Sequence, residues 1–190
     1  MKLDGVLPFA RGLLQKAVQE GGSAIDATMG NGHDTLFLAN LVGEMGRVFS
    51  FDIQAEAIEA TSKRLEDAGV ADRAKLFQTG HENAASCIPE SFHGKLQAAI
   101  FNLGYLPGSD KTIITKSGTT ISAVEQIFEM LSPDGIIVLV VYHGHEGGAE
   151  ERDNLLKFAI GLDQKKAYVL QYGFINQKNN PPFIVAIEKR

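Results

Sequence analysis

The alternation of short apolar runs with longer segments of helical period is the feature that most constrains the fold. Runs rich in β-formers at 23–27, 47–52, 74–79, 96–102 and 135–142 alternate with helical segments at 33–42, 55–68, 82–88 and 119–131, after a leading helix at 6–20. Apolar runs of this kind are typical of strands buried on both faces, which need helices to cover them. The pattern therefore predicts an α/β fold with a parallel sheet between two layers of helices.

The C-terminal part of the chain has a different pattern. A helix at 148–160 and a strand at 165–172 are followed by a turn-rich loop at 179–182 and a last strand at 183–187. Two strands joined by such a loop predict an antiparallel pair at the sheet edge. We therefore expect a Rossmann-like, seven-stranded, mostly parallel sheet with an antiparallel edge strand. No repeat or linker divides residues 1–190, so a single domain is expected.

Composition excludes several classes of protein. Hydrophobic residues make up 44% and charged residues 22% of the chain, as in soluble globular proteins. The single cysteine, Cys87, excludes an intrachain disulfide and a multi-cysteine zinc site, and it favours a cytoplasmic location. The longest apolar run, 136–141, is too short to span a membrane, and Asp4 and Arg11 interrupt the first apolar stretch, so no membrane partner and no signal peptide are expected.

The net charge limits the partners. A formal charge of −5 argues against DNA and against broad non-specific binding to nucleic acid, because such binding depends on an excess of Lys and Arg. A local basic patch remains compatible with this charge.

The most informative stretch is AIDATMGNGHDT at 24–35. A strand is predicted to end at Asp26, the turn contains Gly30 and Gly32, and a helix begins near His33. This order is typical of a nucleotide-binding turn. Asp52 ends the next strand, where a carboxylate can accept hydrogen bonds from both hydroxyls of a ribose. NAD and S-adenosylmethionine both contain such a ribose.

Charge at the turn distinguishes these two cofactors. A dinucleotide places an anionic pyrophosphate at the helix N-terminus. Here Thr35 replaces the third glycine of GxGxxG, and Asp26 and Asp34 lie on either side of the turn, where they would repel a pyrophosphate. The same carboxylates would attract the ammonium and sulfonium groups of S-adenosylmethionine, which the sequence therefore favours. The alternative is that Asp26 only ends a strand and Asp34 only caps a helix.

The third and fourth strand ends supply further candidates. After the third strand, His81 and Glu82 are placed to hold an adenine or its N6 amino group, although a histidine there can equally be structural. The fourth strand ends in Asn102, Leu103, Gly104 and Tyr105, at the edge where open α/β sheets bind ligands. This loop resembles the Asn-Pro-Pro-Tyr loop of amino-group methyltransferases, with both prolines replaced, which implies that Asn102 accepts a hydrogen bond from an attacking amine.

An alkylamine nucleophile has to lose a proton before it attacks, because its pKa is roughly 10.4. The segment after the fifth strand offers Tyr142, His143 and His145, and one histidine could be the base or a substrate contact. A metal site of His143, His145 and Glu146 is the rival interpretation, and a purely structural turn is another. His-Gly-His lacks the helical spacing of the common zinc motif, so no metal is expected.

Five motifs occur in order along the chain: DATMGNGHDT, FDIQ, FNLGYLPGSDK, YHGHEGGAEE and NQKNNPPF. In these motifs, over nearly its whole length, the chain resembles the YtqB/MnmM family of small bacterial class I methyltransferases, also called the rRNA methylase family. The resemblance implies a Rossmann-like class I methyltransferase fold and methylation of 5-aminomethyl-2-thiouridine at the tRNA wobble position, giving 5-methylaminomethyl-2-thiouridine. The implied substrate is then the anticodon loop, since sequence-specific RNA binding usually targets single-stranded bases.

The resemblance, with the candidates above, gives an expected set of site residues. The S-adenosylmethionine-binding residues are expected to be Asp26, Thr28, Gly30, Asn31, Gly32, Asp34, Thr35, Asp52, Ile53, Gln54, His81, Glu82, Asn102, Leu103 and Gly104. The expected catalytic residues are Asn102, Tyr105 and His143, and the expected substrate-binding residues are Tyr105, Lys111, Tyr142, His143, His145 and Asn179. Lys111, Lys116 and Lys178 could supply local cations for RNA, or be ordinary solvated lysines.

Two other functions stay open at this point. A methyltransferase of the same fold could act on rRNA or on a small amine, and a non-catalytic module could bind S-adenosylmethionine or a nucleotide. An exposed edge strand near the C-terminus would also allow a homodimer.

Overall fold

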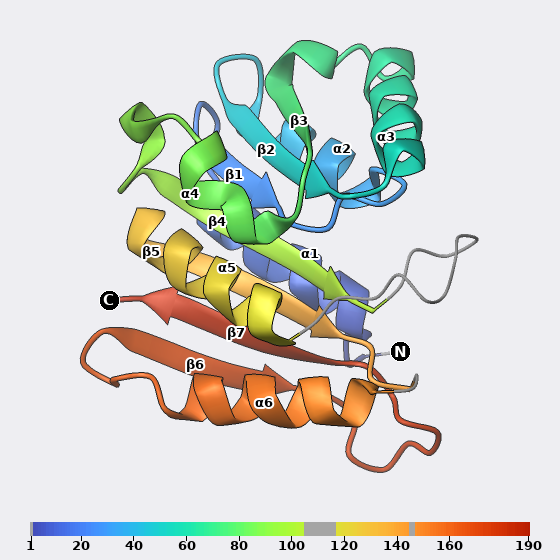
Figure 1. Ribbon diagram of the computed structural model, residues 1–190, viewed down its shortest axis with the longest axis vertical. Coiled ribbons are helices and arrows are strands. Elements are labelled where there is room, and N and C mark those ends of the chain that lie inside the picture. The colour runs from blue at the N-terminus through green and yellow to red at the C-terminus, as the bar shows by residue number, and fades with distance from the viewer. Residues whose placement is uncertain (1, 105–116, 145–146) are drawn as a thin grey trace.

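A computed structural model describes residues 2–104, 117–144 and 147–190 (Figure 1). Within these residues a seven-stranded sheet has the order β3-β2-β1-β4-β5-β7-β6. Its strands are β1 (Ser23–Asp26), β2 (Arg47–Asp52), β3 (Ala74–Gln78), β4 (Leu96–Leu103), β5 (Leu131–Val141), β6 (Ala167–Tyr172) and β7 (Phe183–Lys189). The α-helices are α1 (Val6–Ala17), α2 (His33–Val42), α3 (Ala55–Asp67), α4 (Ala84–Cys87), α5 (Ser117–Met130) and α6 (Gly148–Ile160).

The strand directions confirm the predicted fold class. β1 to β5 pair in parallel, whereas β7 runs antiparallel to both β5 and β6. The reversed strand is therefore β7, next to the edge, and β6 forms the edge itself. The Rossmann-like, mostly parallel sheet expected from the sequence is present.

Two layers of helices cover the sheet (Figure 1). Successive side chains of a strand point to opposite faces. Val138 and Val140 of β5 join the core beneath α1, α2 and α3, while Ile137 and Leu139 join the core beneath α4, α5 and α6. Burial on both faces explains why these strands are continuous apolar runs in the sequence.

The strand order places a switch point between β1 and β4. From β1 the chain moves outward through β2 and β3, then returns to β4 on the other side of β1. Neighbouring connections leave the sheet in opposite directions there, so a crevice opens at the carboxyl ends of β1 and β4. Asp26 and Asn102 lie at these two ends.

One predicted helix is only partly α-helical. The segment predicted as a helix at 82–88 forms a 3-10 turn, His81–Asn83, followed by one α-helical turn, α4. Pro89 fixes where the helix ends, at Cys87, because the residue before a proline is pushed to extended backbone and Ile88 has ψ 126.

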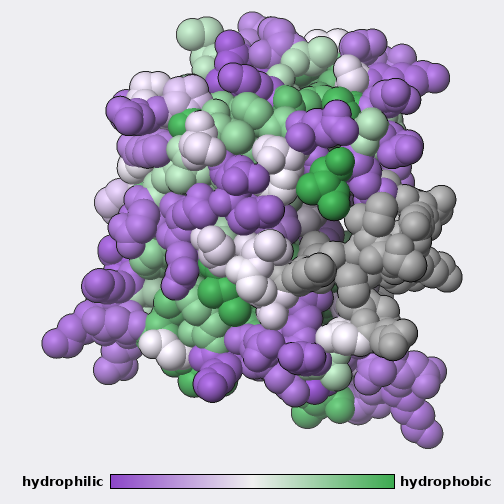
Figure 2. All heavy atoms as spheres, viewed as in Figure 1, coloured by the Kyte–Doolittle hydropathy of each residue, from purple (hydrophilic) through white to green (hydrophobic). Residues whose placement is uncertain are grey.

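Polar side chains cover most of the face shown in Figure 2, with only small apolar areas. No helix within the described residues is long and apolar enough to cross a membrane. On the edge strand β6, Tyr168, Val169 and Leu170 are exposed. The homodimer suggested by the sequence stays a prediction.

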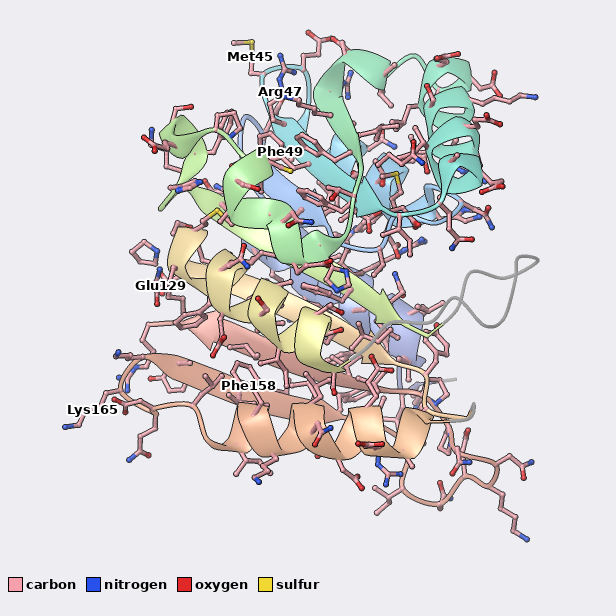
Figure 3. All side chains as sticks on the ribbon, viewed as in Figure 1. Met45, Arg47, Phe49, Glu129, Phe158 and Lys165 are labelled. Atoms are coloured by element: carbon pink, nitrogen blue, oxygen red, sulfur yellow. The ribbon has the colours of Figure 1, made fainter. Side chains whose placement is uncertain are left out.

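Met45, Glu129 and Lys165 lie away from the arrowhead of β4, and so away from the crevice (Figure 3).

Candidate functional site

The glycine turn between β1 and α2 has backbone angles that favour glycine. Gly30 has φ 49 and Gly32 has φ 76. A Cβ on Gly32 would lie 2.8 Å from Oγ1 and 2.9 Å from Cα of Thr61 in α3. Both the backbone angle and the close approach of α3 therefore require glycine at position 32.

Helix α3 also holds the turn by hydrogen bonds that were not predicted. The Thr61 hydroxyl donates to the Gly30 carbonyl (3.1 Å), and Arg64 Nε donates to the Asn31 carbonyl (2.7 Å). Thr61 is fully buried on the face of α3 that also contains Ala57 and Leu65. A polar residue on the apolar face of a predicted helix is the sequence signal that could have identified it. Nothing local in the sequence marks Arg64.

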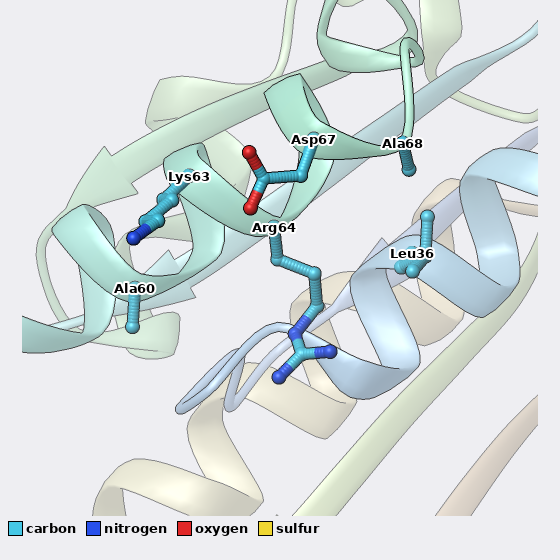
Figure 4. A pocket seen from close by; sticks show the side chains of 6 residues that line it. All are labelled: Leu36, Ala60, Lys63, Arg64, Asp67 and Ala68. Carbon is cyan, nitrogen blue, oxygen red and sulfur yellow. The ribbon is translucent and has the colours of Figure 1, made fainter.

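A groove of about 400 Å³ lies between α2 and α3, and Arg64 extends from it toward the turn (Figure 4). The residues that line it are Leu36, Ala60, Lys63, Arg64, Asp67 and Ala68. None of these residues belongs to the predicted site. The predicted residues lie instead at the carboxyl edge of the sheet.

Asp26, at the end of β1, lies beneath the turn and has no exposed surface. Its carboxylate accepts hydrogen bonds from the Thr35 hydroxyl (2.7 Å) and from the Thr28 backbone N–H (3.3 Å). Burial, and secondarily the charge of Asp34, raise the pKa of Asp26 to about 7, although both hydrogen bonds act in the opposite direction. In this conformation Asp26 organises the turn from below.

This pKa predicts how stability depends on pH. Unfolding returns Asp26 to its ordinary pKa of 3.8. Between about pH 4 and pH 7 the folded protein keeps a proton that the unfolded chain has lost, so the contribution of Asp26 is full at low pH and disappears as pH rises through 7. Asp26→Asn cannot ionise. As pH rises from 5 to 8, the free energy of unfolding of this variant, measured by urea unfolding, should therefore increase by about 2–3 kcal/mol relative to that of the wild type.

Asp67→Asn, which changes an exposed carboxylate on α3, is the matched control. Its unfolding free energy should follow the pH profile of the wild type. Parallel pH profiles for Asp26→Asn and the wild type would contradict a raised pKa at Asp26.

Asp52, at the end of β2, faces the same turn. Its carboxylate accepts from the Gly30 backbone N–H and the Gln54 backbone N–H, both at 3.0 Å. Each carboxylate oxygen has a second lone pair for a further donor. Beside it, Ile53 is exposed and offers apolar surface at the edge of the sheet.

His81, after β3, is a buried histidine held beneath the turn. Its Nδ1 donates to the Ala27 carbonyl (3.0 Å), because a carbonyl can only accept, and burial lowers the pKa of His81. The ring is therefore neutral, and Nε2 is left as an acceptor. That nitrogen is buried and has no hydrogen-bond partner among the described residues. The neighbouring Glu82 uses its backbone carbonyl to accept from Gln126 (2.7 Å).

Asn102, near the end of β4, has a fixed orientation. Its backbone N–H donates to Oγ1 of Thr28 (2.7 Å), and its Nδ2 donates to Oδ2 of Asp34 (2.9 Å). A carboxylate accepts only, so the amide nitrogen faces Asp34 and Oδ1 is the acceptor end. Asp34 also forms an ion pair with Arg11 of α1 (3.0 Å), which no local sequence pattern predicted.

The ends of β4 and β5 meet beside Asn102. The Tyr142 backbone N–H donates to the Leu103 carbonyl (3.0 Å), and a Cβ on Gly104 would lie 3.3 Å from Cβ of Tyr142. Burial and the nearby charge of Asp34 raise the pKa of Tyr142. The structure therefore brings Tyr142 to the same edge as Asp34.

His143 follows directly and contacts the loop between β6 and β7. Its Nε2 donates to the Pro181 carbonyl (3.2 Å), whereas its Nδ1 is buried without a hydrogen-bond partner in the described part of the chain. Asn179 lies exposed in the same loop with φ 68. This loop therefore joins the candidate site through His143.

Several predicted residues lie outside the described ranges: Tyr105, Lys111, Lys116, His145 and Glu146. Within residues 2–104, 117–144 and 147–190, no group of three or more His, Cys, Asp or Glu side chains could hold a metal ion.

Sheet order, glycine turn and carboxyl-edge residues define a class of protein. The fold matches a structure from Clostridium thermocellum over 100% of both chains, with 45% identity and a TM-score of 0.96. A "putative methyltransferase" of Streptococcus mutans, solved in complex with SAH, matches over 99% of both chains with 36% identity and a TM-score of 0.90. The chain is accordingly an S-adenosylmethionine-dependent methyltransferase with a Rossmann-like fold.

The family follows from the sequence match. Residues 48–188 match the model of the family described as "Putative rRNA methylase", and the Clostridium protein carries the same description. The chain belongs to this family. It is also 38% identical over 183 residues to a chloroplastic tRNA (mnm(5)s(2)U34)-methyltransferase of Arabidopsis thaliana, covering 92% of the chain and 66% of that longer protein.

Proposed function

We propose that this protein methylates the amino group of 5-aminomethyl-2-thiouridine at the wobble position of tRNA, giving 5-methylaminomethyl-2-thiouridine. The observation that carries the proposal is the 38% identity, over 92% of the chain, to the Arabidopsis tRNA (mnm(5)s(2)U34)-methyltransferase. The fixed amide of Asn102 supports an amine nucleophile, because its Oδ1 is an acceptor at the edge of the sheet.

The described residues fit S-adenosylmethionine. The remaining lone pairs of the Asp52 carboxylate suit the ribose hydroxyls. Nε2 of His81 is an unpartnered buried acceptor among the described residues, and such an atom suits the N6 amino group of adenine. The exposed side chain of Ile53 offers an apolar contact beside Asp52. The ends of two neighbouring strands, β2 and β3, would thus supply three contacts of one cofactor site.

His81→Phe tests the adenine contact. Phenylalanine keeps an aromatic ring against Phe101 but removes both ring nitrogens, Nε2 and the Nδ1 that donates to the Ala27 carbonyl. Affinity for S-adenosylhomocysteine should therefore fall at least about tenfold in calorimetry, the effect of one lost hydrogen bond to the ligand. The wild type should also prefer S-adenosylhomocysteine to the analogue with oxygen in place of the N6 amino group. If the wild type binds both compounds equally, Nε2 does not read the amino group.

The chain's own residues would position the amine and manage its proton. When bound, S-adenosylmethionine supplies a methyl group that passes from sulfur to the amine nitrogen as the C–S bond breaks and its electron pair stays on sulfur. Asn102 Oδ1 accepts an N–H of the amine and aligns the nitrogen lone pair with that bond. The amine must first lose a proton, and Nδ1 of His143 has the lone pair that a base needs.

The loop between β6 and β7 is our candidate for an RNA contact. Lys178 and Asn179 are exposed in this loop, and Pro181 connects it to His143. Exposed amides and a cation suit the base edges and phosphates of an unpaired loop such as the anticodon.

The test of the proposed function is nucleoside mass spectrometry of tRNA from a strain that lacks the gene. The aminomethyl nucleoside should accumulate, and purified protein with S-adenosylmethionine should convert it in that tRNA to the methylaminomethyl nucleoside. An unchanged tRNA profile would reject the proposal. Methylation of rRNA or of a small amine instead would indicate a different substrate, and absence of any transfer would indicate a binding module.

A further inference from the structure

We propose that Arg11 is a positioning residue for methyl transfer and acts through Asp34 on the amide of Asn102; this inference rests on the proposed function. Both Nε (3.3 Å) and a terminal nitrogen (3.0 Å) of the Arg11 guanidinium lie on Oδ1 of Asp34. The other oxygen of Asp34 accepts from Nδ2 of Asn102 at 2.9 Å. The three side chains therefore form one line of contacts from α1 to the end of β4.

An asparagine amide needs such a constraint. Rotation of the amide by half a turn exchanges oxygen for NH₂, and an NH₂ group cannot accept a hydrogen bond from the substrate amine. Asp34 selects one orientation because a carboxylate accepts only. The backbone of Asn102 is fixed separately, by its N–H bond to Thr28, so the side-chain orientation depends on Asp34.

Asp34 in turn needs a fixed carboxylate. Two donors of one guanidinium on Oδ1 direct Oδ2 toward Asn102. The Asp34 side chain is only 13% exposed, so solvent cannot readily replace these donors, whereas Arg11 is 43% exposed. The charge-assisted hydrogen bonds between Arg11 and Asp34 are partly buried, so they are stronger and fix geometry better than an exposed surface ion pair does.

Arg11 is held by rigid surroundings. Its neighbours Ala10 and Leu14 are buried in the core that α1 forms with β4 and β5. Its guanidinium also lies over the ring of Phe37 of α2, 5.1 Å from the ring centre. Arg11 thus links α1, which packs on β4 and β5, to Asp34 and Phe37 of α2, although it is distant from both residues in sequence.

Arg11→Met, which keeps the length of the side chain and removes the donors, tests the proposal by steady-state kinetics. The kcat for methylation of the tRNA should fall about tenfold, because a misplaced acceptor costs rate, while affinity for S-adenosylhomocysteine stays within about twofold. Arg11→Lys, which retains one donor group, should recover part of the rate. Lys16→Met, which removes an exposed cation from the same helix, is the control and should match the wild type.

A double-mutant cycle separates positioning from a general structural effect. If Arg11 acts through Asn102, Arg11→Met should cause little further loss in an Asn102→Ala background. An equal loss in both backgrounds would overturn the proposal. So would a salt-dependent rise in the KM for tRNA at unchanged kcat, which indicates an RNA contact, or a large loss of S-adenosylhomocysteine affinity, which indicates a cofactor contact.

A readout without substrate keeps this inference separate from the proposed function. In ¹⁵N-labelled protein, the side-chain amide resonances of Asn102, assigned by their loss in Asn102→Ala, should shift and broaden in Arg11→Met but stay unchanged in Lys16→Met. Unchanged Asn102 resonances in Arg11→Met would overturn the positioning role. If the wild type does not methylate the tRNA, the proposed function fails, while this spectrum still decides whether Arg11 orients Asn102.

Discussion

Asn102→Ala is expected to lower kcat for methylation of the tRNA by about 100-fold or more. The substitution removes the acceptor that aligns the amine, and loss of a preorganised polar group in a reaction centre typically has an effect of that size. Affinity for S-adenosylhomocysteine should change much less, because the ribose and adenine contacts that we propose lie at Asp52 and His81. Single-turnover kinetics, together with calorimetry on the same preparation, measure both quantities.

Asn154→Ala is the matched control. Asn154 lies exposed on α6 and donates to the Ser117 hydroxyl (3.2 Å), so its loss should leave kcat unchanged. If Asn102→Ala retains full kcat and only raises KM, the amide does not act on the reacting nitrogen, and its role is uniform binding.

Gly32→Ala should have the second large effect, on cofactor binding and stability together. The new Cβ would meet Oγ1 and the backbone Cα of Thr61 at 2.8 and 2.9 Å, and alanine disfavours the φ of 76. Either the turn or α3 has to move, at a cost of about 1–3 kcal/mol in unfolding free energy. The backbone N–H of Gly30 in this turn donates to the Asp52 carboxylate, so a displaced turn also displaces Asp52. Affinity for S-adenosylhomocysteine should therefore fall at least about tenfold.

Gly12→Ala provides the contrast. A Cβ there has nothing within 4 Å, and the residue lies inside α1, so alanine should be neutral or stabilising by up to about 1 kcal/mol. Trimming Thr61 to alanine should rescue Gly32→Ala only in part, because the contact with the Thr61 Cα remains. Wild-type affinity and stability in Gly32→Ala would show that the turn tolerates both the angle and the crowding.

The fold could be predicted from particular segments with local signals. The run at 136–141 is apolar throughout because β5 lies inside the sheet, between β4 and β7, with helices on both faces. Gly69 follows the end of α3, with φ 67 and its N–H donating to the Glu66 carbonyl (2.9 Å), which is a local glycine stop signal. The helix predicted at 82–88 is present as a helical segment at 81–87, but its first turn is 3-10 and only Ala84–Cys87 is α-helix.

The candidate site was only partly predictable. Strand-end positions identified Asp26, Asp52 and Asn102, since parallel strands bring their carboxyl ends to one edge. The expectation that both Asp26 and Asp34 present negative charge to a ligand needs a change. Asp26 is fully buried with a pKa of about 7, and Arg11 pairs with Asp34.

The sequence by itself determined the alternation of strands and helices, the glycine turn and the polar residues that end each strand, because these depend on local periodicity and backbone preference. Only the tertiary structure decided what each polar group contacts. Arg11 meets Asp34 and Thr61 meets Gly30 through helix packing over the sheet. Burial sets the pKa of Asp26 and leaves Nε2 of His81 without a hydrogen-bond partner among the described residues. Contact and desolvation depend on which segments pack together in space, and no local pattern encodes that arrangement.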